Sequence, residues 1–160
     1  MGKIEEKLKE MGITLPEVEK EPIGKEVIGL IIPAVTVGNI VFTSGTGTDV
    51  KGMEKFAGKL GKELTLEQGQ RAARQCAINL LAYLKAEIGD LDRVERIVRM
   101  IGYVNSAPGF TLQPKVINGA SELFIELWGE KGRHARAALS VNELWADTPV
   151  ECYLVVQLKD

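Results

Sequence analysis

The feature that most constrains this chain is a long amphipathic segment running from Thr65 to Gly89. Thr65 and Gln68 have the spacing of a capping box, in which each side chain satisfies a backbone N–H at the start of a helix. Beyond them, small and apolar residues recur every three or four positions: Leu66, Gly69, Ala73, Cys76, Ala77, Leu80, Leu81 and Leu84. This period predicts a helix that ends at Gly89, and its many small residues favour close packing against a sheet.

Two other segments have helical periodicity. The stretch from Pro114 to Trp128 has a proline in its first turn and Gly129 after its last turn, which is typical of a helix's two ends. A shorter amphipathic helix is predicted over residues 3–11, packed on the outside of the molecule, and Gly12 would end it. Prolines and a glycine among charged residues predict an extended connector up to residue 26.

The remaining apolar runs indicate strands. Residues 31–37 and 40–44 flank Gly38-Asn39, a pattern typical of a β-hairpin. A long strand is predicted over residues 94–104, and two more over residues 132–141 and 148–156. Lysines and glycines in residues 50–64 predict a surface loop.

The predicted order is therefore helix, two strands, helix, strand, helix, two strands. It indicates a single domain over residues 1–160, with residues 1–26 forming the N-terminal helix and connector. Its class is α+β, a mixed sheet with both long helices on one face. The other face would then need cover, for which we expect self-association.

Composition excludes several classes of protein. Hydrophobic residues make up 45% of the chain, charged residues 26%, and the formal net charge is -2, as in a globular protein without general attraction for nucleic acid or anionic lipid. Two cysteines in apolar segments and a single histidine do not suffice for a disulfide scaffold or a zinc site. We expect no metal and, since no apolar leader or bilayer-spanning stretch is seen, a cytoplasmic location.

Arg136 is the leading candidate for a functional residue, because its neighbours Ala135, Ala137 and Ala138 are too small to shield it. Its guanidinium is a permanently charged planar fork that suits a carboxylate. Glu151, at the start of the last strand, could hold or deprotonate a water molecule, and partial burial would raise its pKa. The simpler alternative is a structural ion pair or two unrelated charges.

A hairpin of the last two strands, turning near Ala146, would set Asn142 opposite Glu151 and leave Arg136 roughly 20 Å away. Arg136 and Glu151 could then share a site only through curvature or a neighbouring subunit. No catalytic triad can be drawn with one histidine.

A loop of small residues, 44–48, follows the predicted hairpin and could let a ligand approach the backbone. A phosphate cradle is the weaker interpretation, because Gly45 and Gly47 lack the third glycine of the dinucleotide-binding fingerprint. A simple turn at the end of a strand is the stronger one.

Three stretches resemble the successive signatures of the reactive intermediate deaminase family, also called the YjgF or L-PSP family: 38–45, 118–124, and Ala135-Arg136 with Pro149-Val150-Glu151. Residues 104–108 and 113–121 are similar to a longer subgroup with an extra N-terminal helix. The resemblance implies a chorismate-mutase-like fold assembled as a homotrimer, with clefts between subunits.

The resemblance also implies an activity: hydrolysis of enamines or imines derived from amino acids to the 2-keto acid and ammonia, without metal or organic cofactor. Arg136 matches the arginine that clamps the substrate carboxylate, and Glu151 the carboxylate that positions the attacking water. Ser44 and Gly45 match the cleft lining, and Asn118 a helix residue near it.

The sequence departs from the family pattern at four positions. Ile31 stands where deaminases carry a tyrosine, Ala138 where many have a cysteine, Thr46 where glutamine is common, and Ser121 where the helix has a tyrosine. Thr46 and Ala138 are therefore predicted to border the substrate. The departures keep open a second function, a non-catalytic trimer that binds small carboxylates. An endoribonuclease or translation inhibitor is disfavoured by the acidic balance and by the lack of aromatics on a basic face.

Overall fold

The computed structural model describes residues 2–18, 31–49 and 53–159. Its elements follow the predicted order: α1 (Lys3–Glu10), β1 (Ala34–Val37), β2 (Ile40–Thr43), α2 (Leu66–Ile88), β3 (Val94–Asn105), α3 (Gln113–Trp128), β4 (Ala135–Val141) and β5 (Val150–Leu158). Three short 3-10 turns, η1 (Leu91–Arg93), η2 (Gly129–Gly132) and η3 (Trp145–Asp147), connect them. The predicted capping box of α2 is present.

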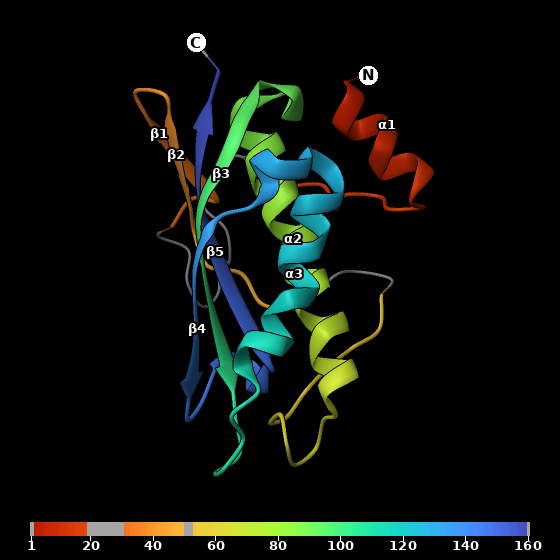
Figure 1. The fold of residues 1–160 in the computed structure, drawn as a ribbon, viewed down its shortest axis with the longest axis vertical. Helices are drawn as coiled ribbons and strands as arrows, with labels where there is room; N and C mark the ends of the chain where they lie inside the picture. The colour runs from red at the N-terminus through yellow and green to blue at the C-terminus, as the bar shows by residue number, and fades with distance from the viewer. Residues whose placement is uncertain (1, 19–30, 50–52, 160) are drawn as a thin grey trace.

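The strands form one five-stranded sheet in the order β1-β2-β5-β3-β4. Neighbouring strands are antiparallel except β3 and β4, which are parallel. Helices α2 and α3 both cover the same face (Figure 1). The structure thus confirms the predicted α+β class.

Small residues let the two long helices and the sheet approach closely. A Cβ at Gly119 of α3 would lie 2.0 Å from the backbone oxygen of Gln70 in α2. On the sheet side, Cys76 donates its thiol hydrogen to the carbonyl of Val150 at 3.4 Å. Both cysteines are fully buried and free, as expected of small apolar core residues.

The hairpin considered for the last two strands does not form. β3 lies between β4 and β5, pairing with β4 in parallel and with β5 antiparallel. α3 is the crossover that returns the chain parallel to β3, as such connections require. Asn142 therefore does not pair with Glu151, whose partner across the ladder is Tyr103.

The predicted surface loop is wrong in part. Of its described residues, Phe56, Leu60 and Leu64 belong to the core. The segment enters the interior because Leu60 hydrogen-bonds the end of β3: its N–H donates to the carbonyl of Asn105, and its carbonyl accepts from the N–H of Ala107. Residues 50–52 lie outside the described residues.

α1 is attached to the end of the layer (Figure 1). Ile4 and Leu8 are buried, while the backbone N–H groups of Lys3 and Ile4 donate to the Asp92 carboxylate at 2.7 and 2.8 Å. Gly12 ends the helix region with a φ of +71°. Of the predicted connector, residues 13–18 have no regular structure and residues 19–26 lie outside the described ones.

The sheet face away from the helices is apolar and largely open. Phe42 is 44% exposed, Val37 63% and Leu139 46%. Exposed apolar surface of this kind is a candidate interaction surface. None of the helices among the described residues combines the length and apolarity needed to cross a bilayer.

Candidate functional site

Arg136 lies on the helix-covered side of β4 and reaches α3. Its guanidinium donates to Asn118 Oδ1 at 2.9 Å, to Ser121 Oγ at 3.0 Å and to the carbonyl of Pro114 at 3.2 Å. Asn118 and Ser121 face it together because residues three apart share a helix face. All three acceptors are uncharged, and within the described residues no carboxylate pairs with Arg136. These hydrogen bonds fix the orientation of the guanidinium group, while its positive charge remains available to a ligand.

His134 extends this network. Its Nδ1 lies 2.7 Å from the carbonyl of Gly132, so Nδ1 carries a proton and donates. Its Nε2, 3.0 Å from Ser121 Oγ, accepts the hydroxyl proton in the neutral ring. Burial lowers the pKa of His134, and the charge of Arg136 lowers it further, which favours that neutral form. Ser121 can therefore accept from Arg136 while donating to His134.

Glu151 lies in a different place, a cleft of about 690 Å³ at the end of β2. Its carboxylate lies over the backbone of Gly45, where a Cβ would stand 2.5 Å from Glu151 Oε1. Only glycine leaves that room. Burial raises the pKa of the Glu151 carboxyl above its ordinary value, so its proton affinity moves toward that of a base useful near neutrality.

The small-residue loop forms one wall of the cleft. Thr46 pairs with Cys152 through two backbone hydrogen bonds of 3.0 and 3.1 Å. Ser44 donates its hydroxyl to the carbonyl of Ile32 at 2.6 Å. From α2, Asn79 donates to the carbonyls of Gly47 and Asp49. The wall is thus held by neighbours on three elements.

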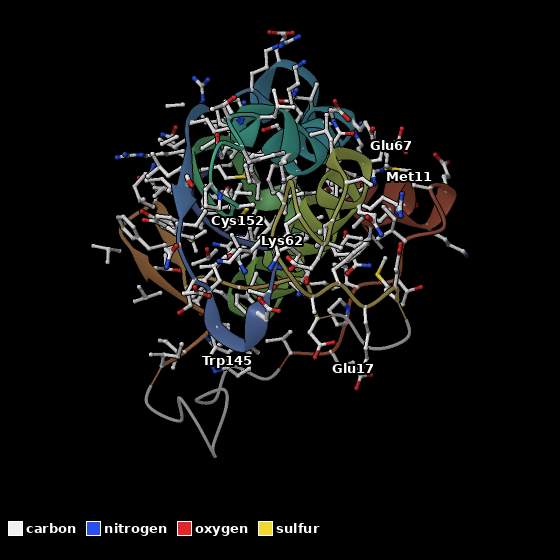
Figure 2. All side chains as sticks on the ribbon, turned by 90° about the horizontal axis from the view of Figure 1, so that it is seen from below. Met11, Glu17, Lys62, Glu67, Trp145 and Cys152 are labelled. Carbon is white, nitrogen blue, oxygen red and sulfur yellow. The ribbon has the colours of Figure 1, made fainter. Side chains whose placement is uncertain are left out.

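Trp145 also lines the cleft. It is 62% exposed and stands at the tip of the turn before β5, far from the buried Cys152 (Figure 2). Ala146 and Asp147, which follow it, both have positive φ, 51° and 57°. Asn105 steadies this strained turn by donating to Asp147 Oδ1 at 3.2 Å.

The candidate residues therefore form two groups. Ser44, Gly45, Thr46 and Glu151 line the cleft, together with Ile31. Arg136 and Asn118 meet elsewhere, on the helix side. Ala138, two residues beyond Arg136, pairs with Gly102 and packs against the core.

The two groups lie on opposite faces of the sheet. Arg136 pairs with Met100, which is buried under the helices, whereas Glu151 pairs with Tyr103. Met100 and Tyr103 are three positions apart in one strand, so their side chains point to opposite sides. Glu151 shares its side with Tyr153, whose ring lies 6.3 Å from that of Tyr103. Curvature within one subunit does not join Arg136 and Glu151.

Sequence reasoning missed several residues around these groups. The sequence did not mark His134 as part of a site, and it marked Ser121 only as a departure from a tyrosine. The signal was the spacing of Asn118 and Ser121, polar and three apart on an apolar helix. Trp145 and Tyr83 of the cleft carried no such signal, because the tertiary fold alone brings them to Glu151.

Comparison with known proteins identifies the family. The model described as "YjgF/chorismate mutase-like, putative endoribonuclease" matches residues 5–158. The chain belongs to the YjgF family. Within it, the chain is 38% identical to the protein TCP17 of Trypanosoma cruzi, over 99% of this chain and 96% of that protein.

Solved structures of YjgF-like proteins agree with this fold. The protein Atu1372 of Agrobacterium tumefaciens, of unknown function, is 37% identical, with a TM-score of 0.85 over 97% of this chain and 91% of the other. A protein of Shewanella oneidensis MR-1, described as a "putative endoribonuclease", is 31% identical. Its TM-score is 0.88, over 98% of this chain and 100% of the other. TdcF of E. coli, solved with bound serine, shares the fold at 19% identity and a TM-score of 0.61, over 91% and 99%.

Proposed function

We propose that this YjgF-family protein, a single domain over residues 1–160 acting in the cytoplasm, hydrolyses enamine and imine intermediates of amino acids to a 2-keto acid and ammonia. The reaction needs a cation that orients the substrate carboxylate and a base that directs water to the C=N carbon. Arg136 and Glu151 would supply these two groups, and Ser44, Gly45, Thr46, Asn118 and Ala138 would border the substrate.

The observation that carries the proposal is the state of Arg136. Its donors are aimed by three neutral acceptors, and no described carboxylate neutralises it. A charge-assisted hydrogen bond to a carboxylate contributes roughly 1.5–3 kcal/mol, and a two-pronged contact also fixes orientation. The serine bound to TdcF, a small molecule with a carboxylate, supports this class of ligand for the fold.

Glu151 supports the second requirement, a base that directs water to the C=N carbon. As a carboxylate it takes a proton from water while the oxygen bonds to the imine carbon, and the C=N π electrons move to nitrogen. The adduct takes that proton on nitrogen and becomes the neutral carbinolamine. Its hydroxyl proton then passes to nitrogen as the C–N bond breaks and the C=O bond forms, which releases ammonia and the 2-keto acid. Burial, which raises the pKa of Glu151, makes its carboxylate a stronger base for the uptake of the proton.

A shared site would be completed between copies of the chain, since Arg136 and Glu151 face opposite sides of one sheet. The exposed apolar face around Val37, Phe42 and Leu139 gives a surface for that assembly. We propose the homotrimer, with Arg136 of one subunit turned toward the Glu151 cleft of the next. Glu151 shares the open face with these apolar residues, so assembly through this face would bring a neighbour close to the cleft.

The test measures the rate of keto-acid release when purified protein is added to an imine that an amino-acid oxidase generates in the same reaction mixture. Release should accelerate, and Arg136→Ala should remove the acceleration. Arg133→Ala is the matched control, a neighbouring arginine that pairs only with Glu130 among the described residues. Glu151→Gln should also slow release, while Glu143→Gln, on the exposed turn, should not.

The alternative is a trimer that binds small carboxylates without catalysis. Ala138, which offers no reactive group beside Arg136, favours it. On this alternative no imine is accelerated, Arg136→Ala abolishes keto-acid binding, and Glu151→Gln leaves binding intact. A ribonuclease would instead cleave RNA and would not accelerate keto-acid release.

A further inference from the structure

A second pocket of about 460 Å³ lies at the end of the molecule that holds α1 and the C-terminal residues (Figure 1). Its apolar wall comes from Ile4, Val94, Leu127 and the indole of Trp128. The first three are almost fully buried. The pocket's size falls in the range of small-molecule sites.

Four lysines surround this wall: Lys3, Lys7, Lys131 and Lys159. They come from α1, η2 and the chain after β5. In a protein whose formal net charge is -2, these four lysines gather around one pocket. Clustered charge of one sign at a concave, low-dielectric surface concentrates counter-ions.

The lysines keep hydrogen-bonding capacity. Lys7 gives one hydrogen bond to the carbonyl of Leu127 at 2.8 Å, and Lys159 one to the carbonyl of Asp92 at 2.5 Å. Each ammonium has three protons, so two remain on each. Of the four, Lys131 alone has a carboxylate partner among the described residues, Glu95 at 2.6 Å.

The one carboxylate in the pocket lining, Asp92, is occupied. Both of its oxygens accept backbone N–H groups at the start of α1. It therefore anchors the helix. Among the lining residues four ammonium groups face one carboxylate, while Glu5 and Asp90 cluster with Asp92 beside the pocket and Glu95 pairs with Lys131.

We propose that this pocket binds a small organic oxyanion, a carboxylate or phosphate attached to a compact apolar group. The lysines would hold the oxyanion, and the wall of Ile4, Leu127 and Trp128 would cover the apolar part. α1, the extra N-terminal helix, would then have a function, because Lys3, Ile4 and Lys7 all belong to it.

This site is separate from the Glu151 cleft. Glu151 is near the first residue of β5 and Lys159 follows its last, so eight residues of extended chain, roughly 25 Å, lie between them. A ligand at one end can therefore be measured independently of the other, and the inference does not depend on the proposed deaminase activity.

The experiment uses Trp128 as its reporter. The chain has two tryptophans, so the variant Trp145→Phe leaves Trp128 alone. Phenyl phosphate, inorganic phosphate and the neutral benzyl alcohol are titrated while Trp128 emission is followed. Phenyl phosphate should change the emission saturably, with the other two binding at least about tenfold more weakly, since each lacks one half of the recognition.

The double variant Lys3→Gln with Lys131→Gln should lower phenyl phosphate affinity by about tenfold. Its matched control is Lys62→Gln with Lys115→Gln, two exposed lysines outside the pocket lining. Melting temperatures confirm that both doubles are folded. The proposal is overturned if emission does not change, if both doubles bind alike, or if inorganic phosphate binds as tightly as phenyl phosphate.

Discussion

Arg136 and Glu151, the two charged candidates of the YjgF-like sheet, differ in how their surroundings hold them. Arg136 donates to three fixed acceptors on α3, and its network continues through Ser121 to His134. Glu151 receives no hydrogen bond from the described residues and rests against Gly45 in an open cleft. The arginine is oriented before any ligand arrives. Burial raises the pKa of the Glu151 carboxyl, and the carboxylate is free to bind water. The first suits recognition and the second suits proton transfer.

The largest effect should come from separating the two groups. Phe42→Asp sets a charge in the open sheet face, opposite Val35 and Val155. If assembly joins Arg136 to a neighbour's Glu151, the variant should sediment as a monomer and imine hydrolysis should fall by roughly a hundredfold or more, because both groups lose their complement.

The matched change is Glu95→Gln, at a partly exposed residue of β3 that lies outside the cleft. It should keep the oligomeric state and the activity. A wild-type protein that sediments as a monomer, or a monomeric Phe42→Asp with full activity, would refute an intersubunit site.

The sequence predicted that two helices pack on one sheet, but it did not predict that Arg136 and Glu151 lie on opposite faces of that sheet. Periodicity and caps were enough for the helices, because α2 and α3 each carry one apolar stripe and clear end signals. The neighbour of β5 in the sheet is set by long-range pairing. Proximity along the chain favoured β4 as this neighbour, but the structure has β3 there. Arg136 was found from its small neighbours, but Ser121 and His134 meet it only because α3 crosses between β3 and β4.

The cleft can be tested through Gly45. Gly45→Ala would set a Cβ 2.5 Å from Glu151 Oε1 and push the carboxylate aside. Imine hydrolysis should fall about tenfold to a hundredfold, close to the loss in Glu151→Gln, with little change in substrate binding through Arg136. The measurement is kcat and KM for the in-place imine.

Gly47→Ala is the comparison, since its Cβ would meet the Thr148 hydroxyl at 3.0 Å and leaves Glu151 untouched. It should reduce activity much less. Equal losses in the two alanine variants would mean that loop distortion, not Glu151, is responsible.

The arginine side has a smaller prediction. Ser121→Ala removes one acceptor of Arg136 and the donor to His134, leaving Asn118 and Pro114 to aim the guanidinium. KM should rise about threefold to tenfold while kcat changes little, because one hydrogen bond contributes about 1 kcal/mol. Ser140→Ala, further along β4, should leave both constants alone. A fall in kcat without a rise in KM would contradict a purely orienting role.

The smallest effect concerns the stability of the folded chain. Because burial raises the folded-state pKa of Glu151 above that of the unfolded chain, the folded state binds more protons between the two values. This contribution makes wild-type protein less stable as pH rises through that window. Glu151→Gln removes it, so the variant's melting temperature should improve relative to wild type from pH 4 to pH 7, even as hydrolysis is lost.

Glu143→Gln provides the control, since its side chain is 71% exposed and pairs with Lys59 across 3.4 Å. It should show no such gain at pH 7. Melting curves of the three proteins at both pH values decide the point. A Glu151→Gln variant that loses stability at pH 7 would mean that favourable contacts stabilise the carboxylate. Glu151 would then be held by its neighbours as Arg136 is, and the case for Glu151 as a general base in a partly buried cleft would fail.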